Sequence, residues 1–209
     1  MEKVIFVDFD GTITKVDTCQ KMVEAFAREG WIELNKLWEE KKLSTRECAN
    51  RTFQLFDANL EELEKLIETI EIDTYFPEFA SMCQTWGYPI YILSDGYDLI
   101  IEKVLKKYNI NIPYYANKLL YDGQFSIECP HHNPDCGICG TCKSTLMEKL
   151  RKNARQTVYI GDGYSDTCPA SKADIVFAKG TLYKYCQEKG IKATHFDNFG
   201  DILRLVASC

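Results

Sequence analysis

The stretch Val4-Ile5-Phe6-Val7-Asp8-Phe9-Asp10-Gly11-Thr12 decides the fold of this chain. Its four consecutive apolar residues, mostly β-branched or aromatic, are typical of a short strand buried on both faces, as in a parallel sheet. Asp8 and Asp10 follow, and Gly11 permits a sharp turn. In open α/β sheets, ligands bind beyond the carboxyl ends of the strands. An Asp there can attack an electrophile, and a second Asp can carry the proton.

The composition limits the classes of protein and partner. A chain of 209 residues suits one domain with a modest insertion. The net charge of −6 argues against nucleic acid as the main partner, but a small-molecule phosphate ester remains compatible with it. We find no apolar run of membrane-spanning length and no signal-peptide pattern, so we expect a cytoplasmic protein without a membrane partner. The oligomeric state is unknown from the sequence.

A long helical block follows the first strand. Residues 17 to about 72 have helical periodicity, and two segments that begin at Ser44 and Asn59 have the capping-box pattern. A βαβ crossover needs only one helix, so this block predicts an inserted cap. We therefore expect an α/β fold, a doubly wound parallel sheet with a small helical cap. The predicted core spans 1–14 and 75–209, and the cap spans 15–74.

Later strand patterns also end in polar residues. Residues 90–93 lead to Ser94, and residues 157–160 lead to Asp162, whereas 114–128 around Asp122-Gly123 predict a β-hairpin. Right-handed crossovers place parallel strands side by side, so these ends could converge with Asp8 and Asp10. Carboxylates with no His nearby suit Mg²⁺. A Ser hydroxyl and a Lys ammonium would then hold the remaining phosphoryl oxygens.

In these motifs the chain resembles the haloacid dehalogenase (HAD) superfamily of phosphohydrolases. Asp8-Phe9-Asp10-Gly11-Thr12 is similar to motif one, Ser94 to motif two, Lys143 to motif three and Gly161-Asp162-Gly163-Tyr164-Ser165-Asp166 to motif four. The four motifs occur in order along essentially the whole chain. The helical block is similar to the small cap of the phosphoserine-phosphatase-like branch.

The resemblance implies a role for each motif. Asp8 would be the nucleophile that forms an aspartyl-phosphate, and Asp10 would be the acid and base. Mg²⁺ would be held by the Asp8 carboxylate, the Asp10 carbonyl and Asp162, with Asp166 nearby. Phosphoryl oxygens would be bound by Ser94, Lys143 and the backbone of two segments, Asp10-Gly11-Thr12 and Asp95-Gly96.

Two departures weaken an assignment to phosphoserine. Asp95 and Ser165 stand where phosphoserine phosphatases usually have Gly and Asn. In the cap, Arg46 and Arg51 are candidate anchors for a carboxylate or phosphate, although each is also compatible with an exposed helix position.

A cysteine-rich segment, residues 129–142, leads directly into Lys143. Its cysteines, Cys129, Cys136, Cys139 and Cys142, suit a structural tetrahedral Zn²⁺ site, while an iron–sulfur centre or a reduced loop without metal are alternatives. Similar segments that end in Cys-Lys occur in two groups of relatives, which act on a methionine-salvage enol phosphate and on phosphoethanolamine or phosphocholine.

These features favour a Mg²⁺-dependent phosphomonoesterase for a small molecule, such as a methionine-salvage enol phosphate. Phosphoserine and an amino-alcohol phosphate are the alternative substrates. A phospho-accepting receiver would place its Asp on a later strand and would lack the helical insert. A non-catalytic zinc-bearing interaction protein would not need every motif residue intact.

Overall fold

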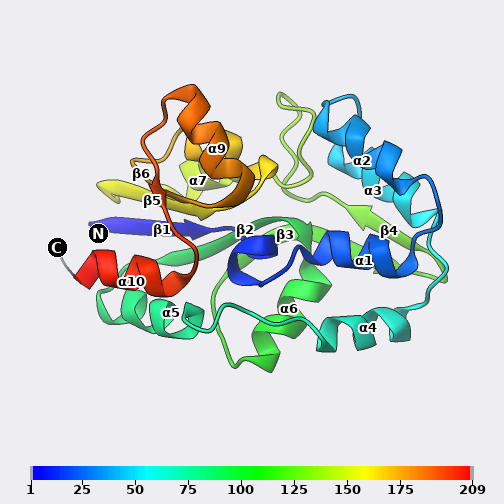
Figure 1. Cartoon of the computed structure of the whole chain (residues 1–209), viewed down its shortest axis with the longest axis horizontal. Coiled ribbons are helices and arrows are strands. Elements are labelled where there is room, and N and C mark those ends of the chain that lie inside the picture. The colour runs from blue at the N-terminus through cyan, green and yellow to red at the C-terminus, as the bar shows by residue number, and fades with distance from the viewer. Residues whose placement is uncertain (1, 208–209) are drawn as a thin grey trace.

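The computed structural model describes residues 2–207, which build a seven-stranded sheet in the order β4-β3-β2-β1-β5-β6-β7 (Figure 1). The strands are β1 Lys3–Val7, β2 Ile90–Tyr97, β3 Tyr114–Tyr121, β4 Phe125–Glu128, β5 Gln156–Gly161, β6 Ile175–Ala178 and β7 Thr194–His195. Every neighbouring pair is parallel except β3 and β4, which form the hairpin expected around Asp122-Gly123. The expected doubly wound α/β fold is confirmed.

Strand β1 lies at the centre of the sheet and is covered on both faces. Val4 and Phe6 belong to one buried cluster, and Ile5 and Val7 belong to another. Its neighbours are β2 and β5, both parallel to it. The apolar run therefore forms the predicted strand buried on both faces. It places Asp8 at the middle of the edge formed by the carboxyl ends of the strands.

Helices cover both faces of the sheet. They are α1 Thr18–Phe26, α2 Trp31–Glu39, α3 Thr45–Phe53, α4 Leu60–Glu68, α5 Phe76–Thr85, α6 Asp98–Lys107, α7 Lys143–Arg151, α8 Thr167–Ala170, α9 Gly180–Lys189 and α10 Phe199–Ala207. Of these, α1–α5 lie between β1 and β2 in the chain. Figure 1 shows α7 and α9 on one face of the sheet, with α5, α6 and α10 on the other. The two buried clusters divide in the same way.

Helices α1–α4 occupy the region predicted to be the cap. Ser44 and Asn59 form both capping boxes, each accepting a bond from the backbone at the third helical residue. Helix α3 packs on β4, and α4 packs on α6. The boundaries of the cap stay a prediction.

Some elements carried no recognised sequence signal. Helix α5 follows α4 without a strand between them, and β7 has only two residues. Among the described residues we find no helix with the length and apolar character that a membrane crossing requires.

Candidate active site

Asp8, the first residue after β1, lies against a buried lysine. The Lys143 ammonium, at the start of α7, donates to Asp8 Oδ1 at 2.6 Å and to Asp166 Oδ1 at 2.6 Å. Lys143 is 3% exposed, and its ammonium also contacts Ser165 Oγ at 3.1 Å. Burial opposes the charge of Lys143, but the Asp166 and Asp8 carboxylates outweigh it and raise its pKa above the usual range. The lysine is therefore a fixed cation beside Asp8.

Asp166 holds this arrangement in place. Its Oδ1 also accepts a bond from the Tyr159 hydroxyl at 2.5 Å. Its Oδ2 accepts bonds from the backbone N–H groups of Asp162 and Gly163, each at 3.0 Å. Each carboxylate oxygen thus has two donors, so Asp166 orients Lys143 and the loop after β5. Tyr159 was not singled out by the sequence, because within a strand pattern it is simply a buried aromatic.

Asp10 lies in a separate hydrogen-bonded pocket. Thr18 at the start of α1 donates to Asp10 Oδ1 through its backbone N–H, at 3.1 Å, and through its hydroxyl. Ser94, within β2, donates to Asp10 Oδ2 at 3.1 Å, while its own oxygen accepts from Gly96 N–H at 2.9 Å. Burial and the Asp17 carboxylate raise the pKa of Asp10 to about 6, against the hydrogen bonds of Thr18 and Ser94.

Two glycines allow the loops to come this close. Gly11 has a φ of +72°, and a Cβ built there would lie 2.5 Å from Asp162 Oδ2. A Cβ at Gly96 would collide with Asp10 Oδ2. Substitution at either position would therefore push the motif loops apart.

Three carboxylates surround one ammonium, and this charge balance suits a divalent cation. Oxygens of Asp8, Asp162 and Asp166 all lie within 4.8 Å of one another. Burial and Asp166 raise the pKa of Asp162 to about 7, although its Oδ1 accepts a 2.6 Å bond from the Thr12 hydroxyl. Burial, followed by repulsion from Asp166, also raises the pKa of Asp8, with Lys143 opposing. A Mg²⁺ ion would relieve this excess of negative charge.

A cavity of about 900 Å³ opens above these carboxylates. Its walls come from α1, α2, α3 and the ends of β1, β2 and β5. Its lining includes Asp8, Asp10, Asp17, Cys19, Gln20, Trp31, Asn35, Trp38, Glu39, Thr45, Phe53, Phe56, Asp95, Tyr97, Asp162 and Tyr164. Among the described residues, no Lys or Arg lines it.

Arg46 and Arg51 do not reach this cavity. Both lie on α3 with exposed side chains, and neither is among the lining residues. Their role as substrate anchors stays a prediction that the geometry does not support.

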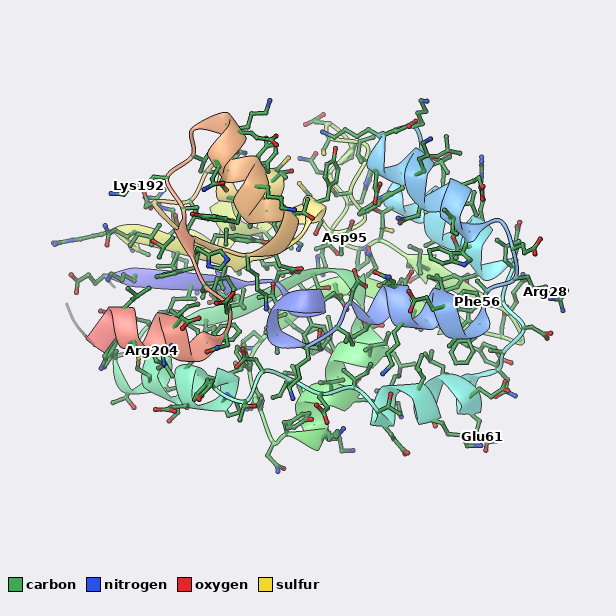
Figure 2. All side chains as sticks on the ribbon, viewed as in Figure 1. Arg28, Phe56, Glu61, Asp95, Lys192 and Arg204 are labelled. Carbon is green, nitrogen blue, oxygen red and sulfur yellow. The ribbon has the colours of Figure 1, made fainter. Side chains whose placement is uncertain are left out.

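The Asp95 side chain reaches across to the helical insert. Its Oδ1 accepts from Thr141 N–H at 2.7 Å and from Asn117 Nδ2 at 3.1 Å. Its Oδ2 accepts from the Thr45 hydroxyl at 2.7 Å. Figure 2 shows Asp95 between the sheet and helices α2 and α3. Gly96, the next residue, lies against Asp10 and Ser94, whereas the Asp95 carboxylate is turned to these partners.

The four thiols of the cysteine-rich segment are not gathered as a zinc site requires. Across residues 2–207, two sets of three or more candidate ligand side chains come within 4.8 Å, and neither set includes Cys129, Cys136, Cys139 or Cys142. The Cys136 and Cys139 side chains are hydrogen-bonded to each other, but a tetrahedral site needs four ligands, and among the described residues no third candidate ligand joins this pair within that distance. The zinc hypothesis has no support from this arrangement.

Comparisons with known proteins identify the family of this chain. The family model described as Putative Phosphatase matches residues 3–189. A 2-hydroxy-3-keto-5-methylthiopentenyl-1-phosphate phosphatase of Bacillus cereus is 34% identical over 95% of this chain and 93% of its own length. A protein of the same name from Lysinibacillus sphaericus is 30% identical over 99% of this chain and 94% of its own.

Solved structures show the same fold. A substrate-bound phosphoserine phosphatase has a TM-score of 0.73 at 22% identity and covers 98% of each chain. The phosphoserine phosphatase of T. onnurineus has a TM-score of 0.73 at 15% identity, over 99% of this chain and 94% of its own. The chain therefore belongs to the putative phosphatase family within the HAD superfamily, and it is a phosphatase.

Proposed function

We propose that this chain hydrolyses a small-molecule phosphate monoester by way of an aspartyl-phosphate on Asp8, with Mg²⁺ as cofactor. One observation carries the proposal. Asp8 ends the central strand with its carboxylate fixed by Lys143, and it faces a cavity that also contains Asp10. A buried, oriented carboxylate next to a proton carrier is what nucleophilic phosphoryl transfer needs.

The reaction would proceed in two balanced steps. The Asp8 carboxylate attacks phosphorus, the bond to the leaving oxygen breaks, and Asp10 gives that oxygen its proton. Asp10 then takes a proton from water as the water attacks the phosphoryl group on Asp8. The phosphorus–oxygen bond to Asp8 breaks, which releases phosphate and restores both carboxyl groups. The raised pKa of Asp10, about 6, lets it serve as acid and base near neutral pH.

The carboxylates of Asp8 and Asp162 would hold Mg²⁺, with Asp166 as a support that is already saturated by hydrogen bonds. When bound, Mg²⁺ would neutralise phosphoryl charge and allow the acidic groups to ionise together. Lys143 remains the protein's own cation beside the transferring group.

The cavity wall supports a substrate class. Trp31, Trp38 and Phe53 offer apolar and aromatic surface, and no described Lys or Arg faces a carboxylate there. This favours an uncharged leaving group, such as the methionine-salvage enol phosphate named in the relatives of Bacillus cereus and Lysinibacillus sphaericus. Asp17 and Glu39 also line the cavity, which favours an amino-alcohol phosphate as the second candidate. The carboxylate of phosphoserine would meet no Lys or Arg among the described lining residues.

A phosphomonoester panel in Mg²⁺ and in excess chelator tests the proposal. We expect turnover of the enol phosphate or an amino-alcohol phosphate, no turnover in chelator, and recovery on adding Mg²⁺. Asp8→Asn should remove activity and any acid-stable phosphoenzyme while keeping the wild-type melting temperature. Turnover by a folded Asp8→Asn protein would refute the nucleophile, and a marked preference for phosphoserine would refute the substrate class.

A further inference from the structure

A chain of hydrogen bonds runs from the cavity wall through Asp95 to the segment before Lys143. The Trp38 indole N–H donates to Thr45 Oγ1 at 3.0 Å, and the Thr45 hydroxyl donates to Asp95 Oδ2 at 2.7 Å. Asp95 Oδ1 accepts from Thr141 N–H at 2.7 Å, two residues before Lys143. We call these four residues, Trp38, Thr45, Asp95 and Thr141, the relay.

The relay joins two parts of the site that belong to different segments. Trp38 and Thr45 come from α2 and α3, and both line the cavity where a leaving group would lie. Thr141 lies two residues before the helix that delivers Lys143 to Asp8, with Cys142 between them. The indole of Trp38 also packs edge-on against Tyr164, in the segment between Asp162 and Asp166, with ring centroids 6.1 Å apart. Trp38 thus touches the motif-four segment directly at Tyr164 and is linked to Asp95 through Thr45.

The two threonines of the relay are held in place by burial and by backbone bonds. Thr45 and Thr141 are buried, at 8% and 1% exposure, so breaking one bond would leave a polar group unpaired. The backbone N–H of Thr45 donates to Ile138 O at 2.8 Å, which fixes the start of α3 independently of the hydroxyl. Asn117 supports Asp95 from β3 by donating to its carbonyl at 2.7 Å and to its carboxylate.

From this geometry we infer that Asp95 is a positioning residue that couples the cavity wall at Trp38 to the segment carrying Lys143. The inference rests on the proposed function, since it concerns how the leaving-group side of the same site supports phosphoryl transfer. A substrate that fills the cavity would press on Trp38 and stabilise the aligned relay. A small substrate would not reach the indole and would gain nothing from it.

Two probes separate these cases: p-nitrophenyl phosphate, whose aromatic leaving group is large enough to extend from the carboxylates toward the cavity wall, and acetyl phosphate, whose leaving group is small. Thr45→Val removes the hydroxyl but keeps the bulk and the backbone bond. We expect it to lower kcat/KM for p-nitrophenyl phosphate about tenfold, as for one hydrogen bond to a charged group, with little change for acetyl phosphate. Asp95→Asn should lower kcat/KM for p-nitrophenyl phosphate by a similar factor.

The double variant Thr45→Val/Asp95→Asn should lose no more than the worse single variant, because residues of one relay are not additive. Trp38→Phe removes the indole N–H at the other end of the relay and should reproduce the loss for p-nitrophenyl phosphate. It also tests the inference if the Asp95 variant does not fold. Thr45→Ser should restore the wild-type ratio between the probes. Thr85→Val, which removes an exposed hydroxyl bonded to Ser81 O on α5, is the matched control and should leave both probes unchanged.

Three results would overturn the inference. The first is an equal loss of kcat/KM for both probes, and the second is an additive loss in the double variant. The third is a wild-type ratio of kcat/KM between the two probes in folded Thr45→Val and Trp38→Phe. Failure of the proposed function is a different result, because the wild-type protein would then turn over neither probe.

Discussion

At the scale of single residues, the site separates two carboxyl groups that the sequence places only two positions apart. Asp8 is paired with a fixed ammonium, and Asp10 is surrounded by hydroxyl and backbone donors. Burial raises both pKa values, but only Asp8 has a cation in direct contact. This difference in environment suits Asp8 as the nucleophile and Asp10 as the proton carrier.

The raised pKa of Asp10 leads to a prediction about how kcat/KM depends on pH. Its protonated form gives a proton to the leaving oxygen, and that form is lost as the pH rises through about 6. We expect kcat/KM for an alkyl phosphate to fall toward tenfold per pH unit above this value. The value for p-nitrophenyl phosphate should fall less, since its leaving group needs little help. Asp10→Asn should slow the alkyl ester by ~10²–10⁴-fold and remove the difference in pH profile. Parallel profiles for the two esters in the wild-type protein would contradict this role.

At the scale of elements, the sequence predicted most of the pieces but not their contacts. The apolar run of β1, the Asp122-Gly123 hairpin and the capping boxes at Ser44 and Asn59 each depend on local chemistry, and all are present. Thr45 and Asp95 are 50 residues apart and carry no common pattern. Thr18 and Tyr159 likewise gain their roles only when the strands and loops are assembled.

The packing of α3 on the hairpin provides the prediction at this scale. Phe53 on α3 is 3% exposed. The centroid of its ring lies 5.8 Å from that of Phe125 on β4 and 5.1 Å from that of Phe56. Phe53→Ala should lower the free energy of unfolding by ~3–5 kcal/mol through lost burial and a cavity. Arg51→Ala on the exposed side of the same helix should change it by about 0.5 kcal/mol or less. Denaturant titration of both variants checks the contrast, which fails if the two losses are similar.

For the whole molecule, acidic groups at the site outnumber the cations that face them. The chain carries a net charge of −6, and Lys143 is the ammonium in direct contact with Asp8 and Asp166. The sequence predicted this cluster through its motif order. It could not predict the pKa values, because these depend on burial and on distances between segments that lie far apart in the chain.

The raised pKa values also make stability depend on pH in the metal-free protein. Asp10 and Asp162 have folded pKa values of about 6 and about 7, above the ordinary value of 3.8. Between pH 3.8 and about pH 7, these two carboxyl groups are ionised in the unfolded chain but still bind protons in the folded protein. The free energy of unfolding therefore falls as the pH rises through this window. The exposed acids with lowered pKa values, such as Glu47 and Glu71, act below their ordinary 4.5 and so do not contribute in this window. His131, whose pKa is lowered from its ordinary 6.5 by burial and then by Lys149, opposes the trend of the two carboxyl groups within it.

Calorimetry in chelator at pH 5 and pH 7.5 measures this effect. Since ~1 kcal/mol corresponds to about 2–4 °C in a chain of this size, we expect the melting temperature to be several degrees lower at the higher pH. Added Mg²⁺ should remove the difference, because it stabilises the ionised carboxylates. Asp162→Asn should reduce the dependence on pH and weaken the response to Mg²⁺. A melting temperature that stays constant or rises from pH 5 to pH 7.5 in chelator would show that burial and neighbouring charges do not raise the pKa values of Asp10 and Asp162 in the folded protein.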